Sequence, residues 1–197
     1  MSFYLVLLAA GNSHRFNSNL SKPYHKIGEK TLLEINLNKT AKFKQIKKTV
    51  IVHNKKDTSK IKKMNLKNIK LLVGGPNRQA STFIALKYLS TQTKIKKVLI
   101  HDVARPNFSM KLLKSIINNL KNSKAVVPII KIQDAIKQKY ESGKNEYIVA
   151  KSRKDLFLTQ TPQAFYLKEI YNLHKNYNNK YRDDDISLFM DLNKVKF

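Results

Sequence analysis

Short apolar runs alternate with amphipathic stretches along most of this chain, and this alternation limits the possible fold more than any other feature. We expect strands at Phe3–Leu8, Thr49–His53, Ile69–Val73, Lys97–His101 and Ala125–Ile130. Apolar residues at helical spacing predict helices at Thr31–Phe43, Ala80–Leu89, Met110–Leu120 and Leu167–Tyr177. Strands that alternate with helices are typical of an α/β protein with a mainly parallel, doubly wound sheet. In the second of these helices we expect Phe83, Ile84 and Tyr88 to face inward.

One polar segment, Lys131–Lys154, does not fit that sheet. Gly143 predicts a hairpin turn within it, and Tyr147–Ala150 predicts a returning strand. We therefore expect an arm over residues 131–154 that projects from a single domain over residues 1–197. The last three residues, Val195-Lys196-Phe197, look like the beginning of a further strand.

Composition excludes several classes of protein. The chain has no cysteine, which rules out disulfides, thiolate metal sites and a cysteine nucleophile. No stretch reaches the roughly 18 apolar residues of a membrane span, so we expect a soluble cytoplasmic protein. The net charge of +26 comes mostly from scattered lysine, and no nucleic-acid-binding signature is present, so a nucleic-acid partner is disfavoured.

The lysine bias makes the few arginines informative, because the planar guanidinium can form bidentate contacts that lysine cannot. Arginine occurs only at Arg15, Arg78, Arg105, Arg153 and Arg182. We therefore consider these positions as candidates for a functional site before any motif is examined.

Special residues follow the predicted strands, where open α/β sheets bind their ligands. Small residues after the first strand, Ala9-Ala10-Gly11, let the backbone approach a ligand, and the cations Arg15 and Lys22 follow them. Backbone N–H groups with nearby cations suit a nucleoside triphosphate. Asp102 follows the fourth strand and could hold Mg²⁺ or a ribose hydroxyl, whereas we interpret His101 as a satisfied strand residue.

Motifs in the expected order resemble the 2-C-methyl-D-erythritol 4-phosphate cytidylyltransferase family from end to end. Each motif alone is weak, but their order is specific, and four of the five arginines fall on arginine positions of the family. The matching pieces are Ala9-Ala10-Gly11 with Arg15 and Lys22, Gly74-Gly75 with Arg78 and Ser81, His101-Asp102-Val103-Ala104-Arg105-Pro106, Thr161-Pro162-Gln163-Ala164-Phe165, and Asp183-Asp184-Asp185.

The resemblance implies a Rossmann-like nucleotidyltransferase fold with a β-arm exchanged in a homodimer. It implies transfer of CMP from CTP to the sugar phosphate 2-C-methyl-D-erythritol 4-phosphate with release of pyrophosphate, in the non-mevalonate synthesis of isoprenoid precursors. It also implies Mg²⁺ as the cofactor. By this resemblance, Arg15 and Lys22 are catalytic and bind the triphosphate. The residues that it assigns to the nucleotide are Ala9, Ala10, Gly11, Gly75, Pro76, Ser81 and Asp102, the last also as a metal ligand. Those that it assigns to the sugar phosphate are Arg105, Thr161 and, from the partner's arm, Arg153.

The chain also departs from the family pattern. Ser13 replaces a glycine, and Lys26 is the fallback if Lys22 is not the family's lysine. Ala135 replaces a threonine that contacts the substrate, and Arg182-Asp183 replaces the usual residues before the acidic run. Because the chain stops before the family's last strand and its asparagine–lysine element, we expect an incomplete domain, or the front part of a fusion with a cyclodiphosphate synthase.

Three alternatives stay open at this point. The nearest is the same chemistry on ribitol 5-phosphate, because that family shares the motifs. A second is a non-catalytic binding or dimerisation module with the same fold, although retention of Arg15, Lys22, Asp102 and Arg105 argues against it. The third is a basic nucleic-acid binder, which a salt-dependent gel shift without CTP would reveal.

Overall fold

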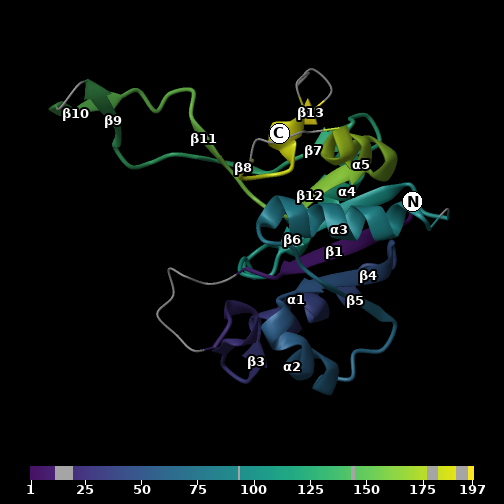
Figure 1. Ribbon diagram of the computed structural model, residues 1–197. Coiled ribbons are helices and arrows are strands. Elements are labelled where there is room, and N and C mark those ends of the chain that lie inside the picture. Colours follow the sequence, from purple (N-terminus) through teal and green to yellow (C-terminus); the bar gives the residue numbers. More distant parts are fainter. Residues whose placement is uncertain (12–19, 93, 143–144, 177–181, 190–194) are drawn as a thin grey trace.

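The computed structural model describes residues 1–11, 20–92, 94–142, 145–176, 182–189 and 195–197 of the chain. Within these residues a seven-stranded sheet has the order β13-β7-β12-β6-β1-β4-β5 (Figure 1). Its strands are β1 (Phe3–Ala9), β4 (Ile46–His53), β5 (Ile69–Val73), β6 (Lys97–Asp102), β7 (Ala125–Val126), β12 (Gln163–Tyr166) and β13 (Val195–Lys196). β12 runs antiparallel to β6 and β7, and the other pairings in this sheet are parallel. The predicted α/β fold with a mainly parallel sheet is confirmed.

Helices cover both faces of the sheet, so the central strands are buried on both sides. The side chains of β1 alternate between two hydrophobic clusters: Phe3, Leu5 and Leu7 lie in one, Tyr4 and Val6 in the other. The first cluster is closed by α1 (Leu32–Ala41), α2 (Thr58–Lys63) and α4 (Met110–Asn119). The second is closed by α3 (Arg78–Ser90) and α5 (Leu167–Asn176). Burial on both faces explains why β1 is a continuous apolar run.

Side-chain caps fix the starts of the main helices. At α1, the Glu34 backbone N–H donates to Thr31 Oγ1 at 3.2 Å, and the Thr31 N–H donates to Glu34 Oε2 at 2.8 Å. This is a reciprocal capping box. Asn77 caps α3 through Ala80 N–H at 2.8 Å, and Ser109 caps α4 in the same way. The cap places Arg78 in the first turn of α3, where it faces the ends of the strands.

The predicted fifth strand, Ala125–Ile130, is wrong as a single element. β7 ends at Val126, and β8 (Ile129–Lys131) pairs with β11 (Phe157–Thr159) in a separate ribbon. Pro128 lies between them and has no backbone N–H, so it cannot continue a ladder. The sequence prediction also omitted β12, which enters the sheet between β6 and β7.

The buried face of α3 also differs from the prediction. Ser81, Thr82 and Ala85 are buried against the sheet together with Leu86 and Leu89. The residues expected to face inward, Phe83, Ile84 and Tyr88, are only half-buried. Phe83 lies toward α5, where its ring stacks on Tyr171 with centroids 5.9 Å apart. The face of α3 toward the sheet therefore combines small residues with Leu86 and Leu89, and Phe83 fills the space beside α5.

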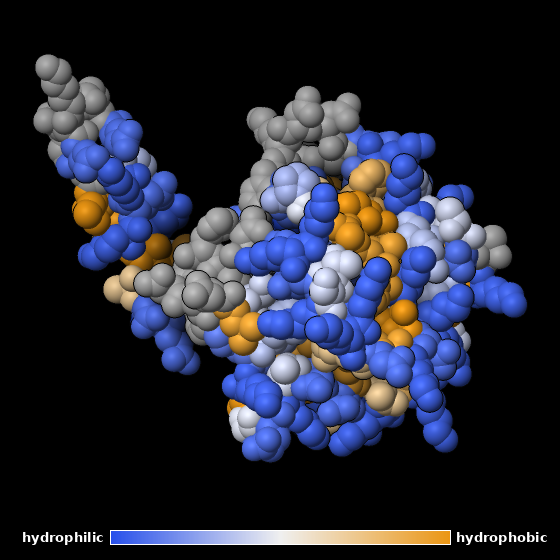
Figure 2. Space-filling model, turned by 60° about the horizontal axis from the view of Figure 1, so that its bottom comes forward, coloured by the Kyte–Doolittle hydropathy of each residue, from blue (hydrophilic) through white to orange (hydrophobic). Residues whose placement is uncertain are grey.

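The polar segment forms the projecting arm that the sequence predicts. β9 (Ile136–Ser142) pairs antiparallel with β10 (Asn145–Lys151), and Figure 1 shows this hairpin standing away from the sheet beyond β8 and β11. Gly143, expected at the turn, lies outside the described residues. In Figure 2 apolar patches interrupt the otherwise hydrophilic arm. Ile148 on the hairpin is 72% exposed, and Phe157 and Leu158 at the base are also exposed.

The remaining short elements are η1 (Lys22–Tyr24), β2 (Lys26–Ile27), β3 (Lys30–Thr31), η2 (Lys55–Asp57) and η3 (Ile186–Leu188). They occupy connections between the larger elements. The strand expected at the end of the chain is present as β13, which pairs with β7. None of the helices in the described ranges has the length and apolar character needed to cross a membrane.

Candidate active site

The carboxyl ends of β5, β4, β1 and β6 lie level with one another at one edge of the sheet. Ala9 of β1 lies opposite His53 of β4, and His53 lies opposite Val73 of β5. On the other side, Leu8 of β1 lies opposite Asp102 of β6. The chain places β4 on one side of β1 and β6 on the other, so this edge contains the switch point where α/β sheets bind ligands.

The loops after β1 and β5 pack together so closely that glycine is required. A Cβ on Gly74 would lie 2.4 Å from the Cβ of Ala10 and 2.9 Å from the Ser81 hydroxyl oxygen. A Cβ on Gly75 would lie 2.7 Å from the Cβ of Ala80. The structure thus brings the residues predicted to bind the nucleotide from the first and third strand ends into one place.

These nucleotide candidates differ in what they present. Gly11 and Pro76 are exposed, and a Cβ on Gly11 would meet open space. Ser81 is buried, and its hydroxyl accepts from Gly75 N–H at 3.1 Å and donates to the Asn77 carbonyl at 2.9 Å. The Ser81 side chain therefore holds the shape of the loop. The Ala9 side chain lies in the core, so a contact from Ala9 would come from its backbone.

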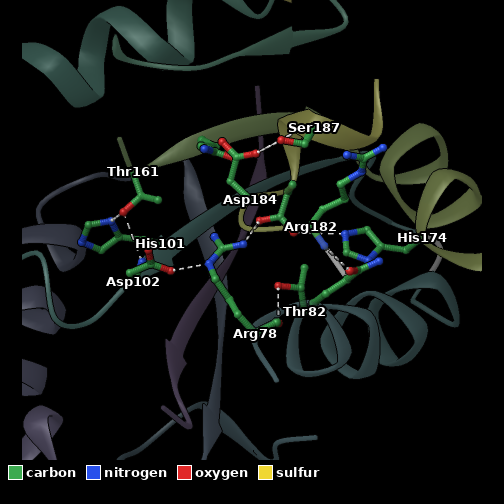
Figure 3. Close-up of polar contacts among 12 residues, drawn as sticks. Arg78, Thr82, His101, Asp102, Thr161, His174, Arg182, Asp184 and Ser187 are labelled. Carbon is green, nitrogen blue, oxygen red and sulfur yellow. Dashed lines mark hydrogen bonds and ion pairs between the residues drawn. The ribbon is translucent and has the colours of Figure 1, made fainter. Parts of the chain in front are cut away.

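A network of charges crosses the site (Figure 3). Arg78 Nε donates to Asp102 Oδ1 at 3.0 Å, and Arg78 Nη1 donates to Asp185 Oδ2 at 2.9 Å. The other oxygen of Asp185 contacts His174 Nε2 at 3.0 Å. Burial alone would raise the pKa of Asp185, but the charge of Arg78 and the bond from His174 lower it below its ordinary value. The carboxylates likewise outweigh burial at Arg78 and raise its pKa.

The predicted sugar-phosphate residues of the body also meet at Asp102. Arg105 Nε lies 3.4 Å from Asp102 Oδ2, and its Nη1 donates to Gln160 Oε1. The Asp102 backbone N–H donates to Thr161 Oγ1 at 3.3 Å. The Arg105 side chain is 46% exposed, so it can turn toward a ligand at little cost.

A buried chain of hydrogen bonds through Asn36, His101 and Thr161 supports the end of β6 at Asp102. The Asn36 side-chain amide donates both of its N–H groups, to the carbonyls of Leu32 at 2.7 Å and Val103 at 3.0 Å. The Asn36 oxygen therefore faces His101 Nε2, 2.8 Å away, which must be the protonated nitrogen. His101 Nδ1 then accepts from the Thr161 hydroxyl at 2.8 Å. The interpretation of His101 as a satisfied strand residue is confirmed.

Lys22 lies on a short turn that is anchored on both sides. It begins η1, directly after buried Ser21 and two residues before buried Tyr24. Ser21 Oγ donates to Asp57 Oδ1 at 3.1 Å. Burial and the nearby charge of Asp57 raise the pKa of Tyr24 to about 12, so its phenol stays neutral. Arg15, the other predicted catalytic cation, lies outside the described residues, as does Ser13.

The structure does not bring Arg153 into this site. Arg153 follows β10 on the arm and is exposed, and its carbonyl accepts from Leu156 N–H at 3.2 Å. Ala135 is also exposed, at the start of the arm. A role for Arg153 in a sugar-phosphate site would therefore require a second chain, and this remains a prediction.

Sequence reasoning missed several residues of the site. Asp185 and His174 were not assigned a role, and Arg78 was a candidate only as one of the few arginines and as part of a motif. The rarity of arginine marks Arg78, and the run Asp183-Asp184-Asp185 is conspicuous in a chain with 13 acidic residues. The sequence contains no signal that would pair residues 78 and 185, which lie far apart along the chain. Asp57 likewise carries no motif.

The donor set at Asp102 is compatible with Mg²⁺. The part of the chain that the structure describes contains no group of three or more metal-ligand side chains. Mg²⁺ is commonly held by one or two carboxylates together with phosphate oxygens of the substrate. Asp102 is a carboxylate whose side chain is 21% exposed at the switch point, so it fits this role once phosphates are present.

The fold and this edge of the sheet define a nucleotide-binding α/β protein. The model of the 2-C-methyl-D-erythritol 4-phosphate cytidylyltransferase family matches residues 3–193. The chain belongs to this family, as its motifs predict. The match extends over nearly the whole sequence and includes the ends of β1, β4, β5 and β6.

Relatives in sequence and structure agree with this placement. The chain is 33% identical over 192 residues to the cytidylyltransferase of that name from Clostridium botulinum strain 657, covering 82% of it. It is 41% identical over 184 residues to the bifunctional enzyme IspD/IspF of Pelagibacter ubique, of which it spans only 48%. The crystal structure of 4-diphosphocytidyl-2C-methyl-D-erythritol synthase from Anaerococcus prevotii superposes with a TM-score of 0.82 at 32% identity, over 99% of this chain and 85% of that one.

Proposed function

We propose that this chain transfers the CMP part of CTP to 2-C-methyl-D-erythritol 4-phosphate and releases pyrophosphate. The observation that supports this most is the convergence of Ala10, Gly75, Asp102, Arg105 and Thr161 at one switch point, in a chain of this family. The proposal places the protein in the non-mevalonate synthesis of isoprenoid precursors. Its expected location is the cytoplasm, with which the absence of cysteine agrees.

The proposed reaction is an in-line displacement at the α-phosphorus of CTP. A phosphate oxygen of the sugar phosphate forms the new bond to this phosphorus. The bond to the bridging oxygen breaks, and its electron pair leaves with pyrophosphate. The attacking oxygen is already anionic near neutral pH, so no general base is needed. The work of the protein is positioning and charge stabilisation, as in other phosphoryl transfers.

The residues divide this work between them. The loop at Ala10 and Gly11 would offer backbone N–H groups to phosphate oxygens, and Lys22 and Arg15 would neutralise the negative charge that develops on pyrophosphate. Arg105 and Thr161 would hold the sugar phosphate. Asp102 would hold Mg²⁺ or the ribose, and a bound Mg²⁺ would add charge neutralisation at the phosphates.

Pyrophosphate release tests the proposal directly. The chain, and a version lengthened at its C-terminus by the family's last strand and lysine, are incubated with CTP, Mg²⁺ and a panel that includes ribitol 5-phosphate. We expect kcat/KM to be highest with 2-C-methyl-D-erythritol 4-phosphate. Release from ribitol 5-phosphate alone would favour the neighbouring family, and no release with either version would refute the proposed activity.

We expect a preference for CTP over UTP and ATP of at least about tenfold in kcat/KM. The reason is that Gly75 to Ser81, held rigid by the Ser81 hydroxyl, would read the amino edge of the pyrimidine. The measurement is a competition assay in which equimolar nucleotides are present together. Equal use of ATP would contradict this role of the loop.

The arm supports a further part of the proposal, a homodimer in which the arms are exchanged. Two-stranded hairpins are marginally stable alone, and this one carries exposed Tyr140, Ile148 and Val149. A partner subunit would cover these side chains. Arg153 could then complete the partner's sugar-phosphate site with a charge-assisted bond.

Subunit mixing tests the exchange. Arg153→Ala and Lys22→Ala, each inactive alone, should recover about a quarter of the wild-type activity after full mixing, because half of the dimers would then have one intact composite site. Activity is measured on the lengthened chain after mixing has been verified. As a matched control, Lys22→Ala mixed with Arg15→Ala should not recover, since both cations act within one subunit. Failure of the first mixture to recover, or a monomer by sedimentation, would contradict the exchange.

A further inference from the structure

The most buried carboxylate of the site is that of Asp185. Asp185 is 1% exposed and lies directly before η3. One of its oxygens meets Arg78 Nη1 at 2.9 Å, and the other meets His174 Nε2 at 3.0 Å. An ionised carboxylate at such depth is costly unless it is fully paired, so the network around it has a defined geometry.

Arg78 transmits this geometry to Asp102. The same guanidinium that is held by Asp185 donates through Nε to Asp102 Oδ1 at 3.0 Å. Arg105 Nε lies beside the second oxygen of Asp102 at 3.4 Å. Two guanidinium groups therefore orient the carboxylate at the end of β6, and the position of one of them is set from the interior by Asp185.

The balance of charge gives Asp185 a second effect. Arg78 carries one positive charge, and without Asp185 this charge would act on Asp102 alone. With Asp185 as its buried counter-ion, Arg78 still orients the Asp102 carboxylate but neutralises less of its negative charge. Asp102 can then attract a cation or a hydroxyl group more strongly. At separations near 3 Å and in partly buried surroundings, the electrostatic interaction between Arg78 and each carboxylate is strong.

We propose that Asp185 is a positioning residue of the nucleotide site, which acts through Arg78 on the orientation and charge of Asp102. The inference rests on the proposed function, because it takes Asp102 as a contact of the nucleotide or its metal ion. It concerns residues that join α5, η3, α3 and β6, so it links the C-terminal part of the chain to the site (Figure 3).

The test is CTP binding in the presence of Mg²⁺, measured by calorimetry without a sugar phosphate so that no turnover occurs. Asp185→Asn should raise the Kd for CTP about tenfold, the order expected when a charge-assisted contact is lost. Asp184→Asn is the matched control, because Asp184 accepts from Ser187 N–H at 3.1 Å and lies outside the network. Its Kd should stay within about twofold of wild type.

Two further variants separate positioning from a merely structural role. His174→Phe removes the contact on the far side of Asp185 and should lower the melting temperature without the tenfold rise in Kd. In an Arg78→Met background, Asp185→Asn should cause no further rise in Kd if it acts through Arg78. A Kd for Asp185→Asn equal to wild type, or a full additional rise in the Arg78→Met background, would overturn the inference.

If Asp185→Asn fails to fold, a second variant still tests the inference. Arg78→Lys keeps the positive charge but lacks the planar fork that contacts Asp102 through Nε and Asp185 through Nη1. It should therefore also raise the Kd for CTP about tenfold. An unchanged Kd for Arg78→Lys would overturn the inference independently of Asp185→Asn. If the wild-type chain binds no CTP, both this inference and the proposed function fail. If it binds CTP and the variants match it, only the inference fails.

Discussion

Replacing Lys22 with alanine should lower the turnover number about 100- to 1000-fold, the range for losing one preorganised group that stabilises developing charge. Lys22 is suited to this role because its turn cannot shift freely. Ser21 on one side is bonded to Asp57, and Tyr24 on the other is buried. The lysine would therefore be in place before the triphosphate binds, and its charge would act without reorganisation of the chain.

The measurement is pyrophosphate release at saturating CTP, with circular dichroism to verify folding. Lys30→Ala removes an exposed lysine from nearby β3 and should leave turnover within about twofold of wild type. Arg15→Ala should show a loss like that of Lys22→Ala. If Lys22→Ala is nearly normal and Lys26→Ala is impaired, the family's lysine is Lys26. Near-normal turnover in both Lys22→Ala and Arg15→Ala would refute the assignment of the catalytic cations.

Acid should destabilise this protein through His101 in a pH range where carboxyl groups contribute little. Burial, aided by the positive charges of Arg105 and Lys39, lowers the pKa of His101 from 6.5 to about 3. Below pH 6.5 the unfolded chain gains a proton at this histidine, whereas the folded chain does not until about pH 3. The free energy of unfolding should thus fall by at most about 1.4 kcal/mol per pH unit in this range, and by about 2.3 kcal/mol between pH 6.5 and 4.5.

Urea unfolding at several pH values between 4.5 and 7, compared between wild type and His101→Gln, isolates this effect. The variant should be less stable at neutral pH but should lose less stability toward acid. The pKa values of Asp185 and Glu34 are lowered, so the stability that they contribute is lost only as the pH falls below their ordinary values of 3.8 and 4.5. Parallel pH profiles for the two proteins would contradict the buried neutral histidine.

The parts of the fold that could be predicted are those decided by local pattern. β5 has the predicted bounds, and β1 exceeds its prediction by one residue. An apolar run such as β1, which is buried on both faces, can be recognised without tertiary information. The predicted fifth strand failed at Pro128, which splits it. β12 was missed because four residues directly after a proline are too few to show the apolar–polar alternation of a strand. The prediction of the buried α3 face failed at Phe83 because α5 offers this side chain a second apolar surface.

The candidate site divides in the same way. The rule that ligands bind beyond strand ends was sufficient to select Asp102, Arg105 and the glycine loop, and the structure brings these together. The contact of Arg78 with Asp185 joins residues 107 positions apart, and no local pattern could predict it. The hydrogen bond of Asp57 to Ser21, next to Lys22, likewise joins distant segments of the chain. Partners supplied by distant segments are set by packing, which single-sequence reasoning does not determine.

The contact between Gly74 and Ala10 limits how these loops can vary. A methyl group at position 74 would overlap the one at position 10 and also press on the Ser81 hydroxyl, so three separate segments share one small volume. A larger side chain at any of the three positions therefore needs a smaller one at another, and residue exchanges at these sites are coupled. In a mutational library most single changes at positions 10 and 74 would be lost to overpacking. An inactive variant there would report on available space, and not on the chemistry of the site.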